Sequence, residues 1–363
     1  MRERSPQLPG FLLRAVSFER SRLRILDQTL LPHRFVYLYP KSAVEVAAII
    51  NRLAVRGAPA IGVAAAYGLA VESQRLPNTR LSQGLEQAAR TLAVARPTAV
   101  NLRWAVERIM RSLPAQRSTP DAVRRTIEAE ARRIEAEEVG RSLAMARHGA
   151  KLLPKNASVL TICNTGALAA PGMGTALAVV FQAHLDGKEP SVYACETRPL
   201  LQGSRLTTLE LLRAKIPVTL IADSAAASVI DRCDVVLAGA DRIAANGDTA
   251  NKVGTRMLAT LARAARKPFY VVAPTSTFDS ATPDGSKIVV EQRDGEEVRA
   301  FAGCRAAPKG VSVFNPAFDV PPAWLITGFI TARGILRPPF RKTIHRLLAG
   351  LVPAATLRSR RVR

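Results

Sequence analysis

The stretch VVLAGADRIAANGDTANKVGT, residues 235–255, decides the fold because it joins a strand, a polar loop and the start of a helix. Its first four residues, VVLA, have the length and composition of a strand buried on both faces. Gly239 lets the backbone leave the sheet, and Asp241 follows where the strand ends. After the turn signal NGD, Asn251 and Lys252 lead into a helical pattern. A carboxylate at a strand end and a lysine near a helix start predict a site for a small anionic ligand.

Four other short, β-rich runs occur in the C-terminal half: SVLTICN, SVYACETRP, VTLIADS and PFYVVAP. Helical patterns separate the five runs and centre near residues 165–186, 205–214, 224–231 and 251–266. Strands that alternate with helices predict a doubly wound parallel sheet, and we assign residues 148–340 to such a Rossmann-like domain. Ligands bind at the carboxyl ends of such strands, where these runs place polar residues, among them Cys163, Asn164, Glu196, Thr197, Asp223, Asp241 and Thr275.

The preceding part of the chain, residues 21–147, reads as a mainly helical domain with a small β-hairpin region at 23–40. Ser42 is placed to cap a helix over 43–54. A helix rich in small residues follows, with Pro59 in its first turn. The charged stretch 118–147 predicts one or two solvated amphipathic helices.

The start of the small-residue helix is a candidate anion site, because Arg56 stands beside its first free N–H groups. Gly57 and Ala58 permit close approach of a ligand to the backbone there. Arg96 precedes a Pro-Thr turn that opens another helix and is a second candidate cation.

The two ends of the chain are basic. Residues 1–20 read as a loose arm. Residues 315–336 predict a turn and a terminal helix, and the tail at 341–363 predicts either disorder or a short basic amphipathic helix over 344–351.

The composition is that of a soluble globular protein except for its charge: 363 residues, 48% hydrophobic, 22% charged and a formal net charge of +23. Such a charge suits nucleic acid, an acidic surface or a phosphorylated ligand. The excess arginine is spread along the chain without an RNA- or DNA-binding motif, so we expect nucleic-acid contact only through the basic ends.

The remaining features are those of a soluble cytoplasmic protein, and they imply no cofactor. The four cysteines are far apart, which argues against a disulfide framework and against a metal site. The chain has neither a signal-peptide pattern nor an apolar run long enough to span a bilayer. It also lacks a P-loop and a complete dinucleotide fingerprint.

The motifs ILDQTLLP, RGAPAIGVAAAYGLA, ARPTAVNL, CNTGALA, ETRPLLQGSRLT, DSAAA, GADRIAANGDTANKVGT, PFYVVAPTSTFD and NPAFDV occur in this order. With them the chain resembles the methylthioribose-1-phosphate isomerase family, which is related to ribose-1,5-bisphosphate isomerases and to regulatory subunits of translation initiation factor two B. The resemblance covers nearly all of the chain except its basic ends. It implies a homodimeric aldose–ketose isomerase of methionine salvage that converts 5-methylthioribose 1-phosphate to 5-methylthioribulose 1-phosphate.

Matched by motif, the family's catalytic cysteine falls on Cys163 and its catalytic acid on Asp241. The positions that bind the phosphorylated sugar fall on Arg56, Gly57, Ala58, Arg96, Gln202, Asn251 and Lys252. Two residues depart from the family pattern: Ile162 replaces a histidine, and Cys195 stands where a polar residue is expected. If both lie near the site, they bear on which substrate is accepted.

The implied substrate carries phosphate on its anomeric oxygen, so an acid must protonate the ring oxygen for the ring to open. Asp241 therefore needs a raised pKa, which desolvation at the end of a buried strand can supply. Hydrogen then moves from C2 to C1. Either Cys163, at the start of a helix opened by Thr165 and Gly166, acts as a base and gives a phosphoenolate, or hydride moves directly between the carbons. A drier pocket beside Ile162 favours hydride transfer.

Two other functions fit the resemblance. One is isomerisation of another ribose 1-phosphate, either 5-deoxyribose 1-phosphate or ribose 1,5-bisphosphate. The other is a non-catalytic regulatory subunit of the initiation-factor type, against which the presence of both Cys163 and Asp241 argues.

Overall fold

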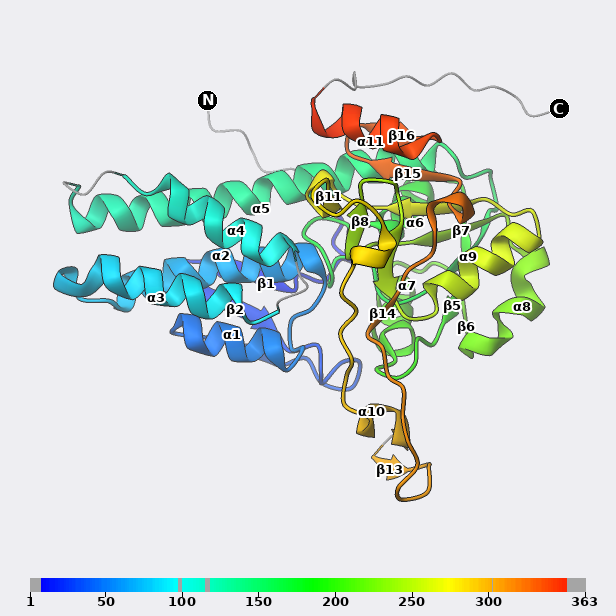
Figure 1. Cartoon of the computed structure of the whole chain (residues 1–363), viewed down its shortest axis with the longest axis horizontal. Helices are drawn as coiled ribbons and strands as arrows, with labels where there is room; N and C mark the ends of the chain where they lie inside the picture. The colour runs from blue at the N-terminus through cyan, green and yellow to red at the C-terminus, as the bar shows by residue number, and fades with distance from the viewer. Residues whose placement is uncertain (1–7, 97–99, 115–117, 302, 351–363) are drawn as a thin grey trace.

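The computed structural model describes residues 8–96, 100–114, 118–301 and 303–350. Helices of the N-terminal half lie on one side of the molecule, and a sheet flanked by helices lies on the other (Figure 1). The Pro-Thr turn after Arg96, the first residues of the basic arm and the end of the basic tail lie outside the described residues.

The sheet has seven strands in the order β16-β15-β10-β7-β4-β5-β6. Its five predicted strands are confirmed and pair in parallel with their neighbours: β4 (Ser158–Thr161), β5 (Ser191–Cys195), β6 (Val218–Ile221), β7 (Val235–Ala238) and β10 (Phe269–Val272). Strand β7 is buried along its whole length, as its apolar composition predicts. Because the strands are parallel, their carboxyl ends meet at one edge of the sheet.

The terminal helix expected within residues 315–336 is wrong. This segment forms strands β15 (Gly328–Thr331) and β16 (Gly334–Leu336), and β15 extends the sheet in parallel beside β10. The apolar spacing of ITGFITARGIL suits a helix as well as a strand. Burial on both faces of the sheet and a turn at Gly334, whose φ is 120°, favour the strands.

The helices between the strands are shorter than predicted: α6 (Ala176–Leu185), η2 (Gly203–Thr207), α7 (Thr208–Arg213), α8 (Ala226–Val229) and α9 (Thr255–Ala264). The helix expected to open at Thr165 and Gly166 begins only at Ala176, so Cys163 is followed by turns. Asn251 and Lys252 lie on a strand instead of at a helix start. That strand, β9 (Thr249–Lys252), belongs to a small sheet with β8 (Arg242–Ala244), β11 (Phe278–Asp279) and β14 (Phe318–Asp319).

The N-terminal half is mainly helical, as predicted. Its helices are α1 (Ala43–Asn51), α2 (Ala58–Arg75), α3 (Leu81–Ala93), α4 (Val100–Ser112) and α5 (Pro120–Ala150). Ser42 caps α1, its hydroxyl accepting the Glu45 N–H. The hairpin is larger than predicted, because β1 (Val16–Glu19) joins β2 (Arg22–Leu26) and β3 (Tyr37–Leu38). The expectation of an irregular arm up to residue 20 is therefore wrong at β1.

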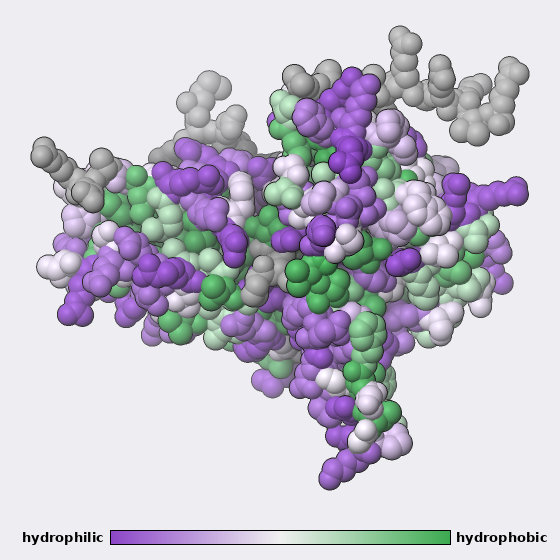
Figure 2. Space-filling model, viewed as in Figure 1, coloured by the Kyte–Doolittle hydropathy of each residue, from purple (hydrophilic) through white to green (hydrophobic). Residues whose placement is uncertain are grey.

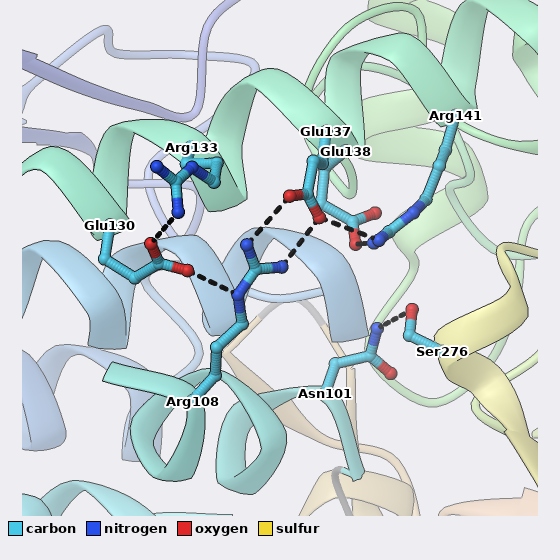
Figure 3. Close-up of polar contacts among 8 residues, drawn as sticks. All are labelled: Asn101, Arg108, Glu130, Arg133, Glu137, Glu138, Arg141 and Ser276. Atoms are coloured by element: carbon cyan, nitrogen blue, oxygen red, sulfur yellow. Dashed lines mark hydrogen bonds and ion pairs between the residues drawn. The ribbon is translucent and has the colours of Figure 1, made fainter. Parts of the chain in front are cut away.

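Helices α4 and α5 are joined by a cluster of ion pairs (Figure 3). The Arg108 guanidinium donates to Glu130 at 2.6 Å and to both carboxylate oxygens of Glu137 at 2.6 and 2.8 Å. At the other end of α4, the buried Asn101 amide donates to Ser276 Oγ at 3.0 Å. Ser276 follows β10, so this bond ties the helical half to the strand-end edge of the sheet.

Two other features complete the fold. A projecting arm carries α10 (Glu296–Arg299), β12 (Ala300–Phe301) and β13 (Cys304–Arg305), and Figure 2 shows hydrophobic surface on it. The described start of the basic tail forms α11 (Phe340–Leu348), which buries Phe340, Ile344 and Leu347. This confirms a short helix in place of disorder as far as Leu348. Short helical turns occupy Asn78–Arg80, Asp223–Ala225, Ile230–Arg232, Thr275–Thr277, Gly285–Lys287 and Ala323–Leu325. Within the described ranges no helix combines the length and apolar character needed to cross a membrane.

Candidate active site

One cavity at the carboxyl ends of β4 and β7 brings the predicted site residues together. All nine line it: Arg56, Gly57, Ala58, Arg96, Cys163, Gln202, Asp241, Asn251 and Lys252. They come from both halves of the chain, so the cavity lies where the helical half meets the sheet. A cavity at this edge is where parallel sheets bind ligands.

Cys163 lies just beyond the end of β4 and has a left-handed backbone, with φ at 64°. A residue with a side chain adopts this conformation only at a cost, so the surrounding structure must hold it. Two threonine hydroxyls do so: Thr197 accepts the Cys163 N–H at 2.8 Å, and Thr207 donates to the Cys163 carbonyl at 2.6 Å. The thiol is thereby presented to the cavity.

Arg56 is the cation beside this thiol. Its Nη1 lies 3.8 Å from Cys163 Sγ, and its Nη2 donates to the Asn164 carbonyl at 2.9 Å and to the Asn164 side-chain oxygen. The Arg56 guanidinium therefore links the Cys163 thiol to Asn164 in the turn after β4.

The start of α2 requires glycine at position 57. Gly57 has φ at 90°, and a Cβ there would lie 2.3 Å from the Ala169 carbonyl oxygen. The same carbonyl accepts the Ala60 N–H at 3.2 Å. The turn after β4 is therefore packed directly against the start of α2, and Gly57, Ala58 and Pro59 at this start line the cavity.

Asp241 directly follows the strand-end pair Gly239–Ala240 and lines the cavity, as its strand-end position predicts. Burial raises the pKa of its carboxyl above the usual range, although Lys252, Arg96 and Arg56 oppose this. A raised pKa is what a general acid requires, because the carboxyl then keeps its proton at higher pH. The Asp241 N–H donates to the Ala250 carbonyl at 2.9 Å, in the turn that leads from β7 into β8, and this bond fixes the backbone at the strand end.

Lys252 and Asn251 approach the cavity from β9. The Lys252 ammonium donates to the Ala317 carbonyl at 3.0 Å and lies 5.3 Å from the centre of the Phe318 ring. Burial lowers the pKa of Lys252, while Cys163 and Asp241 act to raise it. The Asn251 amide donates to Thr255 Oγ1 at 2.8 Å, which fixes its orientation.

Three buried polar atoms of the predicted site have no hydrogen-bond partner among the described residues: Arg56 Nε, Arg96 Nε and Gln202 Oε1. Buried polar groups are nearly always paired within a folded protein. Atoms of this kind, gathered on one cavity, indicate groups that await a polar ligand. Arg96 also pairs with Glu291 at 3.5 Å.

The two departures from the family pattern do not lie in this cavity. Ile162 is 1% exposed and Cys195 is fully buried, and both belong to a hydrophobic cluster with Leu160, Val236 and Phe269. Burial raises the pKa of the Cys195 thiol to about 12. The expectation that both residues lie near the site is not met at the cavity, because neither side chain is among the residues that line it. Because Ile162 does not line the cavity, it gives no reason to expect a drier pocket there.

Several cavity residues were not predicted. Arg293 comes from the base of the projecting arm and is held by Glu291 and Glu297. The other unpredicted lining residues include Leu53, Pro59, Asn164, Thr165, Thr175, Leu200, Pro274 and Phe318. Arg293 follows no strand and belongs to none of the matched motifs, so no sequence signal marked it. Asn164, in contrast, stands beside Cys163 in a polar strand end.

Comparison with known proteins gives consistent matches over most of the chain. The model of the initiation factor 2 subunit family matches residues 54–338. A methylthioribose-1-phosphate isomerase from Pelotomaculum thermopropionicum is 50% identical over 335 residues, which cover 91% of this chain and 92% of the relative.

Two solved structures resemble this one closely. The 5-methylthioribose 1-phosphate isomerase from Pyrococcus horikoshii OT3 has a TM-score of 0.87 at 42% identity and covers 93% of this chain and 96% of its own. The delta subunit of translation initiation factor eIF-2B from A. fulgidus has a TM-score of 0.84 at 39% identity, with 93% and 100% coverage.

Proposed function

The chain belongs to the initiation factor 2 subunit family, and we propose that within it the chain is an aldose–ketose isomerase of methionine salvage. It converts 5-methylthioribose 1-phosphate to 5-methylthioribulose 1-phosphate. The observation that carries this function is the single cavity shared by Cys163, Asp241 and the cations Arg56, Arg96 and Lys252. A purely regulatory subunit has no need of an acid with a raised pKa beside a thiol.

Phosphate binding is the role we assign to the cations and to the start of α2. Arg56 and Arg96 retain an unpaired Nε each, and a dianionic phosphate supplies acceptors for both. Lys252, Arg293 and the positive end of α2 at Ala58 add positive potential on the same cavity. Gln202 and Asn251 are assigned to the sugar hydroxyls.

Ring opening is the role we assign to Asp241. In its acid form Asp241 donates its proton to the ring oxygen while the bond from that oxygen to C1 breaks. The bond electrons stay on the oxygen, which becomes a hydroxyl, and phosphate remains on C1. Burial supports this role because it keeps the carboxyl protonated at higher pH than a solvated aspartate.

Two routes then complete the reaction. In the first, Cys163 as thiolate removes the proton from C2, the C2 hydroxyl gives its proton to the Asp241 carboxylate left by ring opening, and the Cys163 thiol protonates the resulting phosphoenolate at C1; the Arg56 contact at 3.8 Å supports this route. In the second, hydride moves from C2 to C1 as the C2 hydroxyl gives its proton to the Asp241 carboxylate. With C2-deuterated substrate in ordinary water, full washout of deuterium from the product would exclude direct hydride transfer and leave the first route.

The methylthio group suits the apolar side chains of the cavity. Leu53, Leu200 and Phe318 line it together with Pro59 and Pro274. A thioether gains from such contacts, whereas a second phosphate loses hydration against these apolar side chains. This favours methylthioribose 1-phosphate over ribose 1,5-bisphosphate.

The experiment that tests this function is an assay of the purified full chain on methylthioribose 1-phosphate, 5-deoxyribose 1-phosphate and ribose 1,5-bisphosphate. We expect the highest kcat/KM on the first, and loss of activity in Cys163→Ser and Asp241→Asn. Activity that survives both substitutions contradicts the site, and activity on another sugar alone contradicts the substrate.

Further properties belong to the same proposal. We propose a helical domain at 21–147 and a Rossmann-like catalytic domain at 148–340, a cytoplasmic location and a homodimer. Light scattering on the purified chain tests the dimer. Nucleic-acid contact is confined to the basic ends in this proposal, so salt-dependent RNA binding that survives deletion of residues 341–363 argues against the C-terminal end.

A further inference from the structure

Glu210 is a buried carboxyl that the proposed reaction does not use. It lies on α7, is 2% exposed and does not line the cavity. A carboxyl group so deeply buried is costly unless it is fully hydrogen-bonded. The hydrogen-bond partners of the Glu210 carboxyl therefore indicate its role.

The first set of partners leads to the proposed catalytic thiol. Glu210 Oε2 accepts from the Asn164 amide at 2.6 Å, and the oxygen of that amide accepts from Arg56. Arg56 in turn lies 3.8 Å from Cys163 Sγ. Glu210 thus reaches the thiol through a continuous chain of two intervening side chains.

The second set leads to the start of α2. Glu210 Oε1 accepts the Leu168 N–H at 3.2 Å and so holds the turn that follows β4. The next residue of this turn, Ala169, packs its carbonyl against Gly57 and accepts the Ala60 N–H. One carboxyl therefore supports both the cation beside Cys163 and the backbone of the proposed phosphate site.

We propose that Glu210 is a positioning residue of the isomerase: through Asn164 it holds Arg56 against Cys163, and through the turn at Leu168 it supports the start of α2. This inference rests on the proposed function for the roles of Cys163 and the phosphate site. The contacts that carry it do not depend on which sugar is the substrate.

The polarity of the Asn164 amide explains why the carboxylate form is needed. Arg56 only donates, so the amide oxygen must face it, and the amide N–H then faces Glu210. An ionised carboxylate accepts that N–H, whereas a protonated one competes as a donor and favours an amide flip. Burial raises the pKa of Glu210 to about 7, and Arg56, which also acts on Arg205, opposes the rise.

Three variants of the full chain test the chain of contacts. Glu210→Gln keeps the size of the side chain but replaces one of its two acceptor oxygens with an N–H, which must face a donor, either the Asn164 amide or the Leu168 N–H. Asn164→Asp faces the Glu210 carboxylate with a second carboxylate. The double variant restores the pattern of donors and acceptors and moves the negative charge from position 210 to position 164. In it, the Gln amide at position 210 donates to the Asp carboxylate at position 164. That carboxylate in turn accepts from Arg56. Glu138→Gln is the matched control, since Glu138 is another buried glutamate, on α5 and outside the cavity.

The first measurement needs no substrate. Iodoacetamide attacks the thiolate, so the alkylation rate of Cys163, followed by mass spectrometry of its peptide, reports how well Arg56 stabilises it. We expect each single variant to slow alkylation at least 5-fold at pH 8 and the double variant to return within 2-fold of the wild type. The ratio of wild-type to Glu210→Gln rates should increase as pH rises through about 7, as Glu210 ionises.

The second measurement is activity on methylthioribose 1-phosphate. We expect kcat to fall at least 10-fold in each single variant and to recover in the double variant, while Glu138→Gln retains wild-type kcat. Wild-type alkylation rates in Glu210→Gln, or a folded double variant no better than the single variants, overturn the proposal. If the wild type does not turn over the sugar but alkylation follows the predicted order, the proposed function fails and the positioning role stands.

Discussion

Two polar clusters of this protein use their charges in opposite ways. In the α4–α5 cluster every nitrogen of the Arg108 guanidinium is hydrogen-bonded to Glu130 or Glu137 (Figure 3). In the cavity, Arg56 and Arg96 each keep a buried Nε without a partner among the described residues. Saturated pairs stabilise a fold, whereas unsaturated cations reserve donors for a ligand. The comparison separates residues that hold the scaffold from residues that bind substrate, and substitutions can test that separation.

The largest expected effect is the loss of activity in Asp241→Asn. The amide has nearly the same shape but cannot donate an acidic proton, so kcat should fall by about 10²–10⁴-fold. Thermal stability should not decrease, because the substitution removes a carboxyl whose ionisation burial opposes. Steady-state kinetics and thermal unfolding of the same preparation measure both. A kcat within 10-fold of the wild type would remove Asp241 from the reaction.

The opposite result is expected for Arg108→Met. Removing this arginine takes one partner from the buried Glu130, which keeps its bond to Arg133, and the free energy of unfolding should fall by about 1–3 kcal/mol. Folded protein should keep its kcat, because Arg108 does not line the cavity. Urea unfolding and kinetics below the transition measure the two effects. Loss of kcat without loss of stability would reverse the assignment of this cluster.

Glu210 is buried and hydrogen-bonded like the α4–α5 cluster, but it supports residues of the cavity. The pH dependence of stability tests its protonation state. Its pKa is raised from 4.5 to about 7 in the folded chain, so the native state binds a proton more tightly than the unfolded state. The free energy of unfolding contributed by this group is therefore highest below about pH 4.5 and lost by about pH 7, a fall of about 3 kcal/mol. The wild type should lose stability relative to Glu210→Gln across this interval in urea unfolding. A constant difference would show that Glu210 does not titrate there.

Arg96→Ala should have a smaller effect, on binding. Loss of one charge-assisted contact to phosphate should lower kcat/KM by about 10–100-fold. Stability should change little, because the ion pair with Glu291 at 3.5 Å is partly exposed. Inorganic phosphate as a competitive inhibitor provides a second measurement, and its inhibition constant should rise in parallel. An unchanged constant would place the phosphate elsewhere.

Arg90→Ala is the smallest expected change and serves as the control for removing an arginine. Its pair with Glu86, at 4.0 Å on the surface of α3, should contribute less than about 1 kcal/mol. Both kcat/KM and the free energy of unfolding should stay close to the wild type. A large effect on either would mean that overall charge, rather than position, explains the Arg96 result.

The sheet and the site could be predicted because their signals are local. Each central strand is a short apolar run with a polar end, and parallel pairing brings those ends to one edge. Cys163 and Asp241 therefore meet in one cavity although they are far apart in sequence. The cap at Ser42 and the glycine at position 57 are equally local, since each meets a backbone requirement of the helix it starts.

The rest depends on contacts that no local pattern encodes. The terminal strand β15 has a spacing that suits a helix, and only its partner β10 decides between them. Ile162 stands next to Cys163 in sequence, but it packs into the hydrophobic cluster instead of the cavity. Arg293 reaches the cavity from a remote arm, and Glu210 acts from behind it through Asn164. These positions follow from packing between segments, which the sequence of any one segment does not show.

The most direct test of the central claim is nuclear magnetic resonance of the reaction itself. Purified wild-type protein is incubated with methylthioribose 1-phosphate, and the sugar carbons and phosphorus are followed over time. The account predicts a ketone signal at C2, phosphate retained on C1, and a rate that depends on Asp241 but not on Arg108. An unchanged spectrum, or release of free phosphate without a ketone, would contradict it.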